Sequence, residues 1–140
     1  MSIDLNGLKL VNDNYGHNAG DKLIKTFAKA LNEAFTGIGT AIRVGGDEFM
    51  AIVRSEHIEE VDASIAKMTE LQKTFGVGLP IPLEAAYGIA YRRELDKGKQ
   101  VKSDVISEGG SLLDAEIVYH LADERMYAMK AEMKSKLARR

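Results

Sequence analysis

Residues 40–53 read Thr-Ala-Ile-Arg-Val-Gly-Gly-Asp-Glu-Phe-Met-Ala-Ile-Val. Two apolar runs, residues 40–44 and 49–53, flank the polar residues 45–48. Short apolar runs with β-branched residues are typical of strands, and a glycine-rich connection of this length is typical of a tight hairpin. This stretch therefore predicts a β-hairpin that carries two carboxylates, Asp47 and Glu48, at its turn.

Helix-like and strand-like segments follow one another on both sides of this hairpin. Apolar residues spaced by three or four predict amphipathic helices, and short apolar runs between turn residues predict strands. The expected strands are residues 3–5, 40–44, 49–53 and 83–91, and the expected helices are residues 21–35, 58–75 and 113–137. The polar residues 92–110 predict an irregular connection.

The order of the first six elements is strand, helix, strand, strand, helix, strand. This order predicts an α+β fold of the ferredoxin-like type, in which helices flank an antiparallel sheet. In that topology the third strand lies between the first two and is antiparallel to both. The end of the first strand then lies beside the hairpin turn, so we expect Asp4 and Asp47 to be neighbours.

Two neighbouring carboxylates at a sheet edge repel each other unless a cation lies between them. The chain has no cysteine, so a metal must be held by oxygen or imidazole ligands. Oxygen ligands with room for phosphate oxygens suit Mg²⁺. The sequence therefore predicts a magnesium and nucleotide site at Asp4 and Asp47.

A second polar stretch, residues 12–21, reads Asn-Asp-Asn-Tyr-Gly-His-Asn-Ala-Gly-Asp. Its glycines predict a loop just before a helix. The Asn12 amide can donate and accept hydrogen bonds, whereas the Asp21 carboxylate only accepts, and the pair fits the guanine edge with its N1–H and amine. The same residues are also ordinary in turns and helix caps, so Asp21 as a simple cap is the alternative.

Composition limits the class of protein. A chain of 140 residues with 45% apolar residues predicts one domain, residues 1–140. The sequence has no apolar run of eighteen residues and no signal-like start, which favours a cytoplasmic location without membrane contact. A net charge of -2 with mixed signs gives no basic surface for nucleic acid.

Short motifs are spread in a fixed order along nearly the whole chain. They are Ile3-Asp4-Leu5-Asn6 with Lys9, Asn12-Asp13, Gly16-His17, Gly20-Asp21, the hairpin residues 43–49, and Ala122-Asp123 with Met126-Tyr127 and Lys130. This ordered set resembles the GGDEF family of diguanylate cyclases, whose fold is nucleotide-cyclase-like. The resemblance implies a domain that condenses two GTP molecules into cyclic di-GMP with release of pyrophosphate. It also implies that two facing copies share each active site, and that an upstream sensor domain controls them.

The resemblance also implies roles for individual residues. Asp4, Asp47 and the carbonyl of Leu5 would bind Mg²⁺, and Glu48 would complete the acidic catalytic turn. Asn12 and Asp21 would read guanine, and the glycines Gly45 and Gly46 would let the nucleotide approach the backbone. The implied phosphate contacts are Lys9, Lys130, Lys134 and the amides around Gly7 and Leu8.

Departures from the family pattern affect what we expect. Only three residues precede Asp4, so the family's usual first helix is absent and the domain is expected to be N-terminally truncated. Thr36 and Gly39 replace the Arg and Asp of the family's product-binding motif, so product inhibition through that motif is not expected. Lys134 replaces the usual arginine, which weakens a bidentate phosphate contact. The alternative function is a catalytically impaired GTP-binding or interaction module of the same family.

Overall fold

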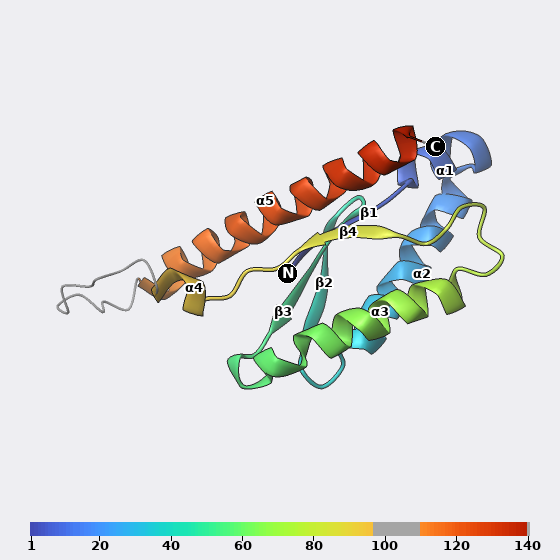
Figure 1. Cartoon of the computed structure of the whole chain (residues 1–140). Helices are drawn as coiled ribbons and strands as arrows, with labels where there is room; N and C mark the ends of the chain where they lie inside the picture. Colours follow the sequence, from blue (N-terminus) through green and yellow to red (C-terminus); the bar gives the residue numbers. More distant parts are fainter. Residues whose placement is uncertain (97–109, 140) are drawn as a thin grey trace. The chain divides into compact units, whose positions relative to one another are not determined.

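The computed structural model describes residues 1–96 and 110–139 (Figure 1). The chain divides into two compact units, which are described separately below. One unit is Ile3–Ala86, and the other is Met1–Ser2 together with Tyr87–Arg140. The expected single domain over residues 1–140 stays a prediction.

Four strands form one antiparallel sheet. They are β1 (Ser2–Leu5), β2 (Gly39–Gly45), β3 (Glu48–Val53) and β4 (Ala85–Gly88). The sheet order is β2-β3-β1-β4, which is the ferredoxin-like order, with β3 between β1 and β2. The predicted α+β fold class is therefore confirmed. The strand expected at residues 83–91 is shorter, since β4 ends at Gly88.

The hairpin of β2 and β3 has the predicted position. The two strands pair antiparallel from Gly39 opposite Val53 to Gly45 opposite Glu48, with an irregularity between Arg43 and Gly45. Only Gly46 and Asp47 remain between the strands, and Gly46 has a φ of 48°. A two-residue connection with positive φ suits the twist of antiparallel strands.

The described chain also contains six helical segments. They are α1 (Leu8–Tyr15), α2 (His17–Phe35), η1 (Ser55–Glu60), α3 (Val61–Phe75), α4 (Arg93–Asp96) and α5 (Gly110–Ala138). The expected helices 21–35 and 113–137 are present and begin a few residues earlier. The helix expected from residue 58 is a 3₁₀ turn, η1, followed by α3. The connection expected at residues 92–110 contains the short helix α4, and its residues 97–109 lie outside the described part.

The loop predicted at residues 12–21 is wrong, because these residues are helical. Asn12 lies in α1 and Asp21 in α2, and only Gly16 separates the two helices. The φ of Gly16 is 88°, a left-handed value that a helix cannot continue through. Fully buried Val11 anchors α1, so tertiary packing outweighs the low helix propensity of its Asn and Asp residues.

The core of the Ile3–Ala86 unit lies between α2 and the sheet. Leu23, Phe27 and Leu31 recur at helical spacing along α2 and are fully buried. The Phe27 ring meets the Phe49 ring of β3 edge to face, with 5.0 Å between centroids and 69° between planes. This pair fixes α2 against the face of β3 opposite to the one that carries Ile52.

In the other unit, α5 packs closely against β4 at Gly88. A side-chain carbon at Gly88 would overlap with the Ala122 carbonyl oxygen and the Met126 amide nitrogen of α5. Ala122 and Met126 are both 1% exposed. Because both obstacles are backbone atoms, a larger residue could fit here only if the helix moved away from the strand.

An ion pair joins α4 to α5 in the same unit. The Arg125 guanidinium donates two hydrogen bonds to the Glu94 carboxylate, at 2.7 Å and 3.0 Å, and one to the Ile89 carbonyl at 2.6 Å. The Arg125 hydrogen bonds, together with one from the Tyr91 amide, lower the pKa of Glu94 from 4.5 to about 2. The pair stays charged at neutral pH and holds α4 beside α5.

We expect Gly88→Ala to destabilise the protein by about 2 kcal/mol, since an added methyl forces backbone atoms apart. Thermal unfolding monitored by circular dichroism measures the change. Gly45→Ala is the matched control, because a side-chain carbon at Gly45 meets nothing within 4 Å. Equal melting temperatures for Gly88→Ala and Gly45→Ala would contradict the close packing of α5 on β4.

Candidate functional site

The end of β1 is joined to the hairpin turn by a backbone hydrogen bond. The amide of Leu5 donates to the carbonyl of Asp47 at 2.8 Å. Asp4, one residue earlier, is only 3% exposed, whereas Asp47 is half-buried. Acidic residues that are 43 positions apart in the sequence therefore belong to directly adjacent backbone segments, as the predicted topology required.

The hairpin turn leaves open space around its glycines. A side-chain carbon at Gly45 or at Gly46 would meet nothing within 4 Å. The Arg43 side chain donates from Nε to the Gly46 carbonyl at 3.0 Å, which braces the turn from one side. Glu48 follows at the start of β3 and is half-buried. The turn thus offers bare backbone next to two carboxylates.

The N-terminus of α1 follows directly after β1. Gly7 precedes the helix in the left-handed conformation, with φ 80° and ψ 9°, and no side chain of the described residues caps it. The first helical hydrogen bond runs from the Val11 amide to the Gly7 carbonyl at 3.0 Å. The amides of Leu8 and Lys9 therefore have no partner within the helix, and such an end attracts anions.

The Asn12 side chain lies against the backbone of α2 at Gly20. A side-chain carbon at Gly20 would overlap with the Oδ1 atom of Asn12 and approach the Leu8 side chain. The absence of a side chain at Gly20 therefore lets the Asn12 amide lie against the backbone of α2, one residue before Asp21. Asp21 itself is exposed. The structure thus places the Asn12 side chain against α2 at a point one residue away from Asp21, and their joint contact with guanine stays a prediction.

Lys130 and Lys134 lie in α5, which belongs to the other compact unit. They are four residues apart on one helix, so they share a helix face. Lys130 is half-buried and Lys134 is exposed. Their predicted contact with phosphate stays a prediction. Lys9 in α1 is exposed beside the open helix N-terminus.

The donor set at the β1 end fits a hard cation. Asp4 and Asp47 supply carboxylate oxygens and Leu5 supplies a carbonyl oxygen, all of the ligand type that Mg²⁺ prefers. Within residues 1–96 and 110–139, no group of three or more His, Cys, Asp or Glu side chains could hold a metal. Mg²⁺ is commonly bound by one or two carboxylates with phosphate oxygens completing the shell, and this arrangement suits the residues present.

Sequence reasoning missed the part that Gly20 plays. It treated the glycine as a turn residue, whereas the structure places it in the first turns of α2. One signal in the sequence could have shown it. A glycine inside a helix destabilises that helix, so it is usually found there only where another group lies close to the helix backbone. Asn12, eight residues earlier, is a candidate for that group.

Comparison with known proteins assigns the chain to a family. The family described as "Diguanylate cyclase, GGDEF domain" matches residues 1–136. The chain belongs to the GGDEF family. The motif that gives the family its name is Gly45-Gly46-Asp47-Glu48-Phe49 in this chain. The family and the sheet order together confirm the nucleotide-cyclase-like fold.

Several relatives are named as cyclases. The chain is 26% identical over 129 residues to diguanylate cyclase DgcS of Shewanella oneidensis, covering 92% of this chain and 38% of DgcS. It is 32% identical over 103 residues to diguanylate cyclase VdcA of Vibrio cholerae, covering 69% of this chain and 30% of VdcA. The GGDEF domain therefore spans well under half of each of these relatives.

Solved structures agree on the fold. A sensory box/GGDEF family protein from Caulobacter crescentus is 25% identical, with a TM-score of 0.58 over 94% of this chain and 76% of that one. The active GGEEF domain of a diguanylate cyclase from Vibrio cholerae is 21% identical, with the same TM-score of 0.58 over 94% of this chain and 74% of that one. Among the described residues, no helix is long and apolar enough to cross a membrane.

From the predicted role of Asn12 in reading guanine, we expect Gly20→Ala to weaken GTP binding about tenfold, because the new methyl displaces the Asn12 amide from α2. Loss of one buried or shielded hydrogen-bonding group costs a ligand about 1–3 kcal/mol. Isothermal titration calorimetry with GTP and Mg²⁺ measures the loss, and thermal unfolding checks the fold.

A double-mutant cycle isolates the cause. In an Asn12→Ala background the Gly20→Ala change should have little further effect, because the displaced group is already gone. A full tenfold loss in that background would show that Gly20 acts through something other than Asn12.

Proposed function

We propose that this chain is a diguanylate cyclase domain, which binds GTP with Mg²⁺ and condenses two GTP molecules into cyclic di-GMP with release of pyrophosphate. The observation that carries the proposal is the hydrogen bond from the Leu5 amide to the Asp47 carbonyl in a member of the GGDEF family. It joins the two backbone segments that bear the acidic residues, at a turn where bare backbone can meet a nucleotide.

The acidic residues form the proposed metal site. Asp4, Asp47 and the Leu5 carbonyl would hold Mg²⁺, and Glu48 would add a further negative charge at the turn. When bound, Mg²⁺ polarises the α-phosphate of GTP and neutralises the charge that develops on pyrophosphate. The burial of Asp4 fixes its carboxylate before any ligand arrives, so little of the binding energy is needed to order it.

The proposed guanine site lies where α1 packs against the start of α2. Asn12 offers both a donor and an acceptor, and Asp21 accepts from the N1–H and the amine of guanine. Adenine presents an acceptor at N1 and no donor there, so the Asp21 carboxylate would face a lone pair. The pair therefore favours GTP over ATP.

The open N-terminus of α1 is the proposed phosphate cradle. The amides of Leu8 and Lys9 and the partial positive charge of the helix end attract phosphate oxygens. The Lys9 ammonium adds charge next to them, and Lys130 and Lys134 are proposed as further phosphate contacts from α5. Gly7, in its left-handed conformation, allows the chain to turn directly from the metal ligands into this helix.

A second copy of the domain completes the reaction. One domain offers one guanine site, whereas the product joins two GTP molecules, so two copies must face each other with their nucleotides between them. The 3′-hydroxyl of each GTP attacks the α-phosphate of the other, so that two phosphodiester bonds form and two pyrophosphates and two protons leave. We expect the pair to be brought together by a sensor domain and to work in the cytoplasm.

We predict that concentrated protein incubated with GTP and Mg²⁺ forms cyclic di-GMP, detected by chromatography, and that Asp47→Asn abolishes it. The substitution keeps the size of the side chain and the backbone carbonyl that binds Leu5, but removes the charge that holds the metal. We expect turnover at least a hundredfold lower with an unchanged melting temperature.

Glu33→Gln is the matched control, since Glu33 is an exposed carboxylate on α2 away from the turn. An artificial dimeriser fused to the chain removes weak association as a cause of inactivity. If the fused dimer binds GTP but forms no product, and Asp21→Ala abolishes the binding, the cyclase proposal is wrong. The chain would then be a GTP-binding module without catalysis.

A further inference from the structure

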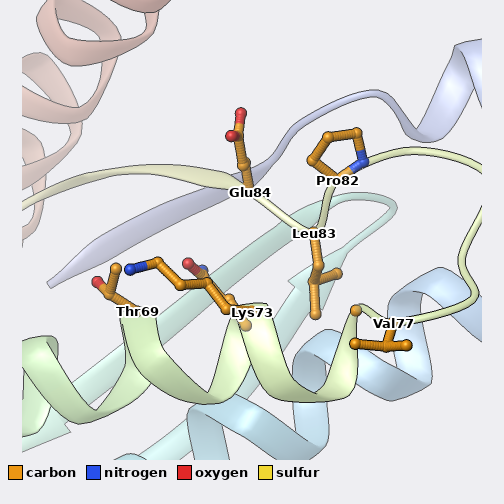
Figure 2. Close-up of a pocket in the computed structure, with 8 residues that line it drawn as sticks. Thr69, Lys73, Val77, Pro82, Leu83 and Glu84 are labelled. Atoms are coloured by element: carbon orange, nitrogen blue, oxygen red, sulfur yellow. The ribbon is translucent and has the colours of Figure 1, made fainter.

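A cavity separate from the proposed nucleotide site lies between the C-terminal half of α3 and the segment that leads into β4 (Figure 2). Its volume is about 420 Å³, within the range of small-molecule sites. All of its lining residues belong to the Ile3–Ala86 unit, and none of them is a predicted GTP or metal contact. We call it the α3–β4 pocket.

Gln72 is a buried polar residue in the lining of this pocket. It is 7% exposed, and its Nε2 atom has no hydrogen-bond partner among the described residues. Buried polar groups are nearly always hydrogen-bonded, because an unsatisfied donor away from water is costly. A ligand oxygen in the pocket would meet this need once the terminal amide turns its Nε2 atom toward the pocket. Gln72 therefore points to a ligand that carries an acceptor.

The pocket lining contains one cation that an anion could bind. Lys73 lines it and pairs with Glu70 at 3.0 Å on the exposed side of α3. An exposed ion pair of this kind adds little stability, so the ammonium can turn to a bound carboxylate at low cost. The only carboxylate in the lining is that of Glu84, and Figure 2 shows its side chain pointing away from α3. One cation and one amide donor suit a monoanion.

The remaining wall is apolar. Leu83 points toward α3 in Figure 2 and is 5% exposed, and Pro82 stands beside it. Val77 is 83% exposed, so an apolar group laid over it would remove much of its surface from water. The wall thus accepts a short branched hydrocarbon rather than a second charged group.

We propose that the α3–β4 pocket binds a small apolar monocarboxylate. Its carboxylate binds the Gln72 amide and the Lys73 ammonium, and its branched tail covers Val77 and Leu83. Such a ligand accepts a hydrogen bond from the buried Gln72 amide, pairs with the Lys73 ammonium and covers the apolar wall.

The pocket wall continues into the start of the proposed phosphate cradle. The Asn6 amide donates to the Glu84 carbonyl at 2.9 Å, and a side-chain carbon at Gly7 would overlap with the Ile81 side chain. Residues 81–84 therefore contact the connection between β1 and α1, and a ligand that shifts these residues would also shift that connection.

Methyl-detected NMR on the whole chain tests the proposal, with isovalerate at pH 7 as the probe and no nucleotide present. We expect saturable shifts of the Val77 and Leu83 methyl signals. Acetate, which lacks the tail, and isoamyl alcohol, which lacks the charge, should each bind at least tenfold more weakly. Because no GTP is used, the result does not depend on the proposed cyclase activity.

Two variants locate the carboxylate. Gln72→Met keeps the length of the side chain without its donor, and Lys73→Met removes the cation, so each should weaken isovalerate binding about tenfold. Lys67→Met, an exposed change on the same helix, should leave it unaltered. The proposal is overturned if isovalerate gives no saturable shift, or if Lys73→Met binds it as tightly as the wild type. If Gln72→Met unfolds, the exposed Lys73 variant still decides the matter.

Discussion

The hydrogen bond between the Leu5 amide and the Asp47 carbonyl is the contact on which the proposed site depends. It exists because β3 lies between β1 and β2, so the end of β1 meets the turn that enters β3. Moving β1 to the other side of β4 in the sheet would keep every helix and strand but separate the two acidic segments. The order of the strands in the sheet therefore brings the two acidic segments together, as the proposed metal site requires.

Glycines set how closely the neighbouring elements approach. Gly7 allows the chain to enter α1 directly after β1, and Gly20 lets the Asn12 amide lie on α2. In the other unit, Gly88 gives α5 close contact with β4. At each of these positions glycine loses more conformational entropy on folding than another residue would, but it allows a close approach that no other residue allows. The site thus depends on small residues as much as on charged ones.

Much of this arrangement follows from the sequence, because apolar periodicity reports burial directly. The spacing along α2 and the two apolar runs in residues 40–53 predicted the element types, and the order of the elements predicted the sheet order and the proximity of Asp4 to Asp47. Helix α1 escaped prediction because Asn12, Asp13 and Asn14 favour turns locally, and only the burial of Val11 in the folded protein outweighs that preference. The α3–β4 pocket escaped it because Gln72 and Leu83 meet only in three dimensions.

The central claim is that Asp4 and Asp47 hold one divalent cation with GTP. Mn²⁺ in place of Mg²⁺ broadens NMR signals of nearby nuclei, steeply with distance, so amide spectra recorded with Mn²⁺ and GTP test the claim directly. The account predicts the strongest broadening at the amides of Leu5 and Asp47, and much less at Gly39 and Val53 at the far end of the hairpin. Strong broadening at only one of the two acidic segments, or at neither, would contradict it.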